Sequence, residues 1–166
     1  QTTYFAMSHQ DVRMYLNGLL LEFDSQGLTA VATDGHRMAI AKLALTDIEV
    51  QHRVIIPRKG VLEILRLLSS IEDSAIQLLA GDGHLSIQTK SYTFITKLVE
   101  SRYPSYSRVL PRQLSTFALI DKDILKRALS RITILAHEKT KAIILSLDSN
   151  SLCLIGANQQ QEEATE

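Results

Sequence analysis

Asp34 and His36 come closest to a catalytic pair by residue type and spacing. They lie in the segment Thr33-Asp34-Gly35-His36-Arg37, where a carboxylate could orient an imidazole that acts as a general base. Asp-Gly is also a common turn dipeptide, because both residues tolerate the backbone conformations of tight turns. The spacing favours the turn, and a small α+β enzyme that uses Asp34 and His36 stays as the alternative interpretation.

The sequence contains no other pattern typical of catalysis or metal binding. Its 5 histidines are scattered, without the paired spacing of metal proteases. No Ser or Cys sits in a nucleophile elbow, and no Gly-rich phosphate loop precedes a predicted helix. The single cysteine, Cys153, cannot form an internal disulfide or a cysteine cluster. We therefore predict no enzyme activity, no cofactor and no metal site.

Hydrophobic periodicity predicts the elements that would hold these residues. Strands are expected over 15–23, 28–33, 37–45 and 53–56, then a helix over 58–70 and a three-stranded meander over 75–79, 85–90 and 92–99. A non-helical connector spans 101–113, because Pro104 and Pro111 interrupt it. A strand over 116–120, a helix over 122–136 capped by Asp121, and strands over 142–147 and 151–156 follow.

The second half of this pattern repeats the first. Lys59-Gly60-Val61-Leu62 and Lys122-Asp123-Ile124-Leu125 each begin a predicted helix, and each helix leads into a meander. Such a repeat is typical of a modular α+β protein whose helices pack on antiparallel sheets.

Composition limits the possible functions. The chain has 166 residues, 45% hydrophobic, with 18 basic residues balancing 18 acidic ones. That is enough apolar content to bury a core, in one large domain or parts of two. No membrane span or export signal is recognisable, and the lone cysteine fits a reducing, cytoplasmic setting. The chain begins with Gln1, so we expect a piece of a longer protein.

Basic side chains gather on both predicted helices, while most acidic ones lie elsewhere. The first helix carries Arg58, Lys59 and Arg66, and the second carries Lys122, Lys126, Arg127 and Arg131. These are either ordinary solvated helix faces or one surface that faces phosphate backbones. At the end of the second helix, Ile134 points away from the predicted core face and forms a small apolar patch with Leu135, which suits a partner contact or packing under a loop.

Several segments, in this order, resemble the bacterial sliding-clamp family, the beta subunit of DNA polymerase III. The resemblance rests on Ser8-His9-Gln10-Asp11-Val12-Arg13-Met14-Tyr15-Leu16-Asn17-Gly18, Ala32-Thr33-Asp34-Gly35-His36-Arg37-Met38-Ala39, Ile56-Pro57-Arg58-Lys59-Gly60, and Arg102-Tyr103-Pro104-Ser105-Tyr106-Ser107-Arg108-Val109-Leu110-Pro111. It implies a DNA-clamp fold, with most of the middle domain and its connector over 1–113 and a truncated last domain over 114–166.

The resemblance also implies a function without catalysis. Clamps of this family close as ring dimers around duplex DNA, without sequence preference, and tether the replicative polymerase, the clamp loader and repair proteins through a peptide pocket. This chain alone is not expected to close a ring. A purely structural interaction module remains a third interpretation.

Site residues follow from the matching motifs. Positions near DNA are Gln10, Met14, Tyr15, Arg58 and Lys59, and helix geometry extends the set to Lys122, Lys126, Arg127 and Arg131. The peptide pocket is expected at Leu16, Thr33, Gly35, His36, Arg37, Met38, Pro104, Arg108 and Val109. Ile134 and Leu135 match the pair that holds the ring closed.

Overall fold

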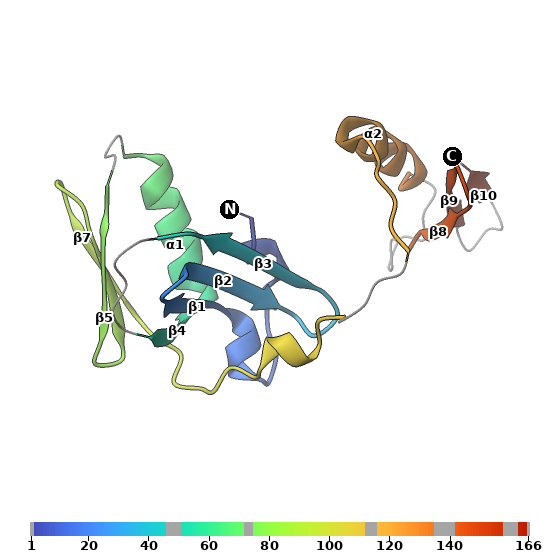
Figure 1. The fold of residues 1–166 in the computed structure, drawn as a ribbon. Helices are drawn as coiled ribbons and strands as arrows, with labels where there is room; N and C mark the ends of the chain where they lie inside the picture. The colour runs from blue at the N-terminus through green and yellow to red at the C-terminus, as the bar shows by residue number, and fades with distance from the viewer. Residues whose placement is uncertain are drawn as a thin grey trace. The chain divides into compact units, whose positions relative to one another are not determined.

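The computed structural model describes residues 2–45, 51–71, 75–111, 116–134, 142–157 and 163–165. The chain forms two compact units, residues 1–109 and 110–166, and each is described by itself (Figure 1). None of the described helices is long and apolar enough to cross a lipid bilayer.

The first unit is built on a four-stranded antiparallel sheet. Its strands are β1 (Gly18–Asp24), β2 (Gly27–Thr33), β3 (Met38–Leu43) and β4 (His52–Pro57), in the order β3-β2-β1-β4. The four strands predicted for this region are confirmed, with shifted ends. The register pairs Leu20 with Val31 and with Ile55, so one face of the sheet carries aliphatic side chains from three adjacent strands.

The start of the first predicted strand is wrong, because Met14–Asn17 form a 3-10 helix, η2. The Asn17 side chain explains the difference. Its Oδ1 accepts from the Asp11 N–H at 2.9 Å, and its Nδ2 donates to the Asp11 carbonyl at 2.8 Å. Local bonds between side chain and backbone compete with strand pairing, and here they hold a turn.

A helix and a second sheet complete this unit. The helix α1 runs over Arg58–Ser69, as predicted within one residue. The predicted meander forms β5 (Gln77–Gly81), β6 (His84–Gln88) and β7 (Thr93–Lys97) in that order. The turn between β5 and β6 places Asp82 at φ 49° and Gly83 at φ 73°, the left-handed conformation that two-residue hairpin loops require.

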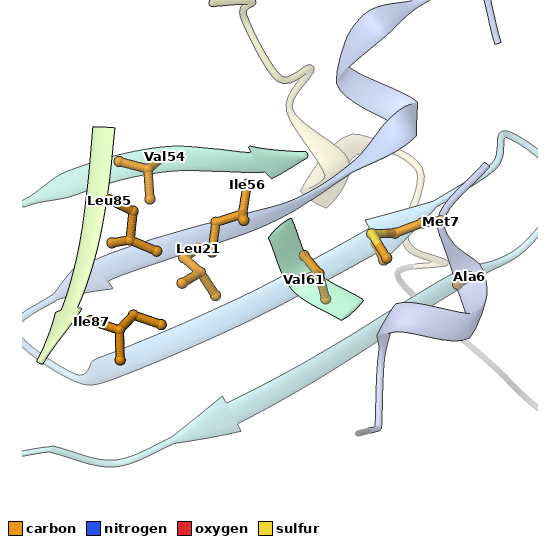
Figure 2. Close-up of a cluster of buried hydrophobic side chains, with 9 residues drawn as sticks. Ala6, Met7, Leu21, Val54, Ile56, Val61, Leu85 and Ile87 are labelled. Carbon is orange, nitrogen blue, oxygen red and sulfur yellow. The ribbon is translucent and has the colours of Figure 1, made fainter. Parts of the chain in front are cut away.

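Buried side chains lie on both faces of the first sheet. On one face, Val61 of α1 packs against Leu21 and Ile56 from β1 and β4 and against Leu85 and Ile87 from β6 (Figure 2). Ala6, the last residue of the 3-10 helix η1 (Tyr4–Ala6), and Met7 after it also belong to this cluster.

The opposite face is covered by the connector that follows β7. Leu20, Val31 and Ile55 pack there against Tyr103, which is 7% exposed. The connector is joined to β4 where the Val99 N–H donates to the Ile55 carbonyl at 2.8 Å. It ends in the 3-10 helix η3 (Tyr106–Arg108), so helix α1 and the connector lie on opposite faces of one sheet.

The second unit contains the helix α2 (Lys122–Ile132) and a sheet with the order β10-β9-β8. The strands are β8 (Ile144–Leu147), β9 (Leu152–Ala157) and β10 (Glu163–Thr165). The predicted Asp121 cap is confirmed, because its carboxylate accepts from the Asp123 and Ile124 N–H groups at 2.9 Å each.

Two expectations for this unit are wrong within the described residues. Residues 116–120 form no strand. Leu119 is fully exposed and Phe117 is 89% exposed, so no described neighbour supplies the ladder that a strand needs. The helix ends at Ile132, and the Thr133 hydroxyl donates to the Leu129 carbonyl at 2.9 Å. The rest of its predicted length, 135–136, lies outside the described residues.

Candidate functional site

A groove of about 340 Å³ lies in the first unit, between the β2–β3 loop and the connector. It brings together every residue expected in the peptide pocket except Arg108. The lining residues are Arg13, Tyr15, Leu16, Thr33, Gly35, His36, Arg37, Met38, Tyr103, Pro104, Ser105, Tyr106 and Val109. Segments far apart in sequence thus form one concave, largely apolar surface.

Side-chain bonds hold the β2–β3 loop in shape. The Thr33 hydroxyl donates to the Arg37 carbonyl at 2.7 Å and accepts from the Gly35 N–H at 3.1 Å. Asp34 Oδ1 accepts from the His36 and Arg37 N–H groups at 3.0 Å each. Gly35 takes φ 92°, a conformation that costs glycine little. These hydrogen bonds therefore hold the backbone that carries His36 and Met38 on the groove wall.

These bonds also argue against a catalytic pair of Asp34 and His36. The Asp34 carboxylate accepts from backbone N–H groups and pairs with Arg37 Nε at 3.0 Å, and no bond joins it to the His36 ring. The hydrogen bond from the His36 N–H, with those from Arg37, lowers the pKa of Asp34. Asp34 organises a turn and does not orient an imidazole.

Arg37 is fixed on the groove rim by three interactions. Besides its ion pair with Asp34, its Nη2 donates to the Phe5 carbonyl at 3.0 Å, and its guanidinium lies 5.8 Å from the centre of the Phe5 ring. A planar guanidinium can make all of these contacts at once. Arg37 therefore joins the groove loop to the N-terminal segment.

Arg13 is a groove residue that sequence reasoning missed. Its Nε and Nη2 bond the Asp11 carboxylate at 2.9 and 2.8 Å, and this pairing lowers the pKa of Asp11 to about 2. A Cβ added at Gly35 would lie 3.3 Å from Arg13 Nη2. The Asp-x-Arg spacing was the available signal, since an Asx turn with a following Arg can form such a bidentate pair.

Tyr103 and Tyr106 were also missed, although both lie inside the connector motif. The Tyr103 ring meets the Tyr15 ring edge-on, with centroids 5.8 Å apart. Burial raises the pKa of Tyr103 to about 12, and burial together with a bond to Glu22 raises that of Tyr106 to about 12. Both rings pack against side chains of the sheet and line the groove.

The residues expected near DNA occupy two places in the first unit. Arg58 starts α1, where its Nη2 lies 3.3 Å from His9 Nε2, and Lys59 beside it is exposed. Gln10 and Met14 are exposed on the segment before β1, whereas Tyr15 lines the groove. The α1 residues thus lie on the side of the sheet that the groove does not use.

In the second unit, the expected DNA residues lie along α2. Lys126, Arg127 and Arg131 are exposed, and Lys122 Nζ lies 3.9 Å from Asp123 Oδ1. Ile134, expected at a subunit interface, is 78% exposed. Its expected partner Leu135 lies outside the described residues.

Comparison with known proteins identifies the class. The family model for the DNA polymerase III beta subunit central domain matches residues 1–105, and that for its C-terminal domain matches residues 107–166. The chain belongs to this family, and its α+β clamp fold is confirmed. No groups of three or more His, Cys, Asp or Glu side chains that could hold a metal occur among the described residues.

Individual relatives agree with this assignment. The chain is 42% identical to a beta sliding clamp of Proteus mirabilis, covering 100% of the chain and 45% of that protein. A crystal structure of a Pseudomonas aeruginosa sliding clamp bound to griselimycin superposes with a TM-score of 0.93 at 43% identity, over 99% of this chain and 45% of that one. A C. crescentus beta sliding clamp superposes with a TM-score of 0.91 at 29% identity, over 99% of this chain and 45% of that one. The chain thus spans less than half the length of these relatives.

Proposed function

We propose that this chain forms part of a replicative sliding clamp, a protein without catalytic activity that encircles duplex DNA as a ring dimer. The observation that carries this function is the match to clamp relatives along the whole chain. The catalytic alternative has no support, since Asp34 is engaged by backbone N–H groups and Arg37. Action on DNA inside bacteria also implies a cytoplasmic location.

The arrangement of the first unit supports two separate binding roles. Arg58 and Lys59 begin the helix on one face of the sheet, and the groove opens on the other. A ring that holds DNA topologically needs only modest basic charge on its inner wall, because phosphate contacts fix no sequence. A neutral chain with basic helices meets this requirement. Further proposed DNA contacts are Gln10 and Met14 in the first unit and, separately, the basic residues of α2 in the second.

The groove suits a short peptide with hydrophobic anchors. Leu16, Met38 and Val109 offer apolar surface, and the lining contains Arg13, Arg37 and His36 without any carboxylate. Apolar contacts provide affinity in such grooves, while a few placed polar groups set orientation. We propose that the replicative polymerase, the clamp loader and repair proteins dock here, with Arg108 close by.

Peptide binding can be tested with the 166-residue chain itself. A fluorescent hexapeptide that contains Gln and Leu/Phe anchors should bind weakly, and Met38→Ala should weaken binding at least about tenfold, since truncating a buried anchor costs more than 1.4 kcal/mol. Ile95→Ala, on the exposed side of β7, is the control and should bind as wild type. Equal affinity for Met38→Ala and wild type would exclude the groove as the peptide site.

Clamp function needs a ring, so a chimaera provides the test. This chain would replace the matching 45% of the Proteus mirabilis clamp, and the length of DNA copied per binding event would be measured with the polymerase and loader. Long products and a dimer in sedimentation are expected, and Ile134→Ala with Leu135→Ala should give a folded monomer. A dimeric chimaera that fails to extend the products would contradict the function.

A further inference from the structure

A second cavity of about 480 Å³ lies in the first unit, separated from the groove by Tyr103, which lines both. Four consecutive residues of β4, from His52 to Ile55, line it. Successive side chains of a strand point to opposite faces of its sheet. A cavity that touches all four must therefore run along the edge of β4, on the side away from β1.

That edge carries unpaired backbone groups. The Ile55 carbonyl points away from β1, because it accepts from the Val99 N–H at 2.8 Å. By alternation the Arg53 N–H and carbonyl and the Ile55 N–H point the same way. Among the described residues none of these three groups has a hydrogen-bond partner. Val99 closes the edge at Ile55, which is 4% exposed and lines the cavity, whereas the edge at Arg53 is exposed to solvent.

The surroundings of the cavity indicate what could pair there. Leu20, Leu98 and Val99 give it an apolar floor, and the hairpin tip that carries Asp82 forms its far wall. Asp82 and Glu100 make no ion pair among the described residues, whereas Arg53 is already paired with Glu22. Arg102 is the one guanidinium of the rim without an ion pair in the described part of the chain.

We propose that the open edge of β4 is a second docking site, which takes an extended segment of a partner protein as an added strand. Backbone bonds to Arg53 and Ile55 would supply affinity, and the cavity would take an aliphatic side chain next to a basic one, which would face Asp82 and Glu100. This site is distinct from the groove, because it lies on the other side of Tyr103 and would bind its partner through backbone hydrogen bonds.

The direct measurement is hydrogen exchange at two amides of the 166-residue chain. The probe is an acetylated and amidated hexapeptide, Thr-Lys-Val-Thr-Val-Thr. Without peptide, the Arg53 and Ile55 amides should exchange faster than that of Val54, which pairs with β1. Saturating peptide should slow both at least about tenfold, because each gains a hydrogen bond. A peptide methylated at the paired amides should give no protection, and protection by that peptide would overturn the proposal.

Protein variants separate this site from the groove. Gly81 lines the cavity, and a Cβ added there would meet no atom within 4 Å, so Gly81→Phe should fold and block the edge. Asp82→Asn keeps a residue that tolerates positive φ and should weaken the Lys peptide several-fold, but not a Glu version. Met38→Ala should lower groove-peptide binding and leave edge protection unchanged. Loss of edge protection in Met38→Ala, or its persistence in Gly81→Phe, would refute a separate edge site.

Discussion

The two units repeat one helix-and-meander pattern, but their helices are held in different ways. α1 packs against strands of two sheets, and Val61 on its buried face is 4% exposed. α2 contacts β9, and Ile132 and Leu154 are the buried hydrophobic residues among those described in its unit. Ile124, an aliphatic residue in the first turn of α2, is 58% exposed. Two helices of similar sequence are therefore stabilised by different amounts of tertiary packing.

The N-termini of the two helices show the reverse: the well-packed α1 lacks a side-chain cap, and the sparsely packed α2 has one. α1 follows Pro57 without a side-chain cap, whereas Asp121 caps α2 through two backbone N–H groups. Isolated helices of this length are marginal in water, and tertiary packing usually supplies most of their stability. Where packing is sparse, the cap contributes a larger share of the helix's stability. We expect core substitutions to affect the first unit most and cap substitutions the second.

The largest effect is expected from Leu85→Ala, in the core that joins α1 to both sheets of the first unit. Leu85 is fully buried, and removing a buried leucine side chain costs about 2–5 kcal/mol. Urea unfolding followed by NMR signals of each unit should show this loss in residues 1–109 only. An equal loss in the second unit would mean that the units unfold together, and the comparison would fail.

Gly60→Ala tests the close packing of α1 and should have the next largest effect. A Cβ at Gly60 would lie 2.7 Å from Thr96 Oγ1, and such overpacking costs about 1–3 kcal/mol, against a helix gain of up to about 1 kcal/mol. A net loss is expected, and adding Thr96→Ala should recover part of it. The repeat offers a matched control, because Asp123 occupies the same position in α2 and is exposed. Asp123→Ala should change stability much less, and a larger loss than for Gly60→Ala would contradict this account.

Asp121→Ala should destabilise α2 by about 1 kcal/mol, the usual cost of removing an N-cap. The expected readout is a lower urea midpoint for the second unit alone. Asp121→Asn retains a side-chain oxygen acceptor and should lose little. Equal losses for Ala and Asn would show that the carboxylate acts through its charge and not as a cap.

Much of the fold could be predicted because local pattern and tertiary role agree. Alternation in the first sheet and the 3.6-residue period of α1 correspond to faces that are buried in the structure. Residues 116–120 have the same alternation but no described strand beside them, so periodicity alone predicted a strand that does not form. Pairing is non-local, and a single segment carries no information about whether its partner is present.

In the groove, too, the features set by local sequence could be predicted and those set by non-local contacts could not. The motifs around Gly35 and Pro104 identified two of its walls, because they are contiguous stretches of sequence. Arg13 enters the groove only through its bonds to Asp11, and Tyr103 through packing on Leu20 and Val31. Such contacts depend on how the connector crosses the sheet. The aromatic residue directly before Pro104 was a signal that could have been used.

The smallest effect concerns Asp34, which resembles Asp121 in accepting from two backbone N–H groups but does so in the groove loop. Its pKa is lowered below 3.8 by those bonds and by Arg37, so the ionised form is favoured in the folded state. The stabilisation is complete above about pH 5, where the unfolded chain is also ionised, and is lost as the pH falls through the folded pKa. The His36 and Arg37 amide signals should therefore shift together in acid, with a midpoint below 3.8, and groove-peptide affinity should fall with them. Asp34→Asn keeps an acceptor and removes the charge, so its amides should show no such step; a step of the same midpoint in Asp34→Asn would assign the transition to another group.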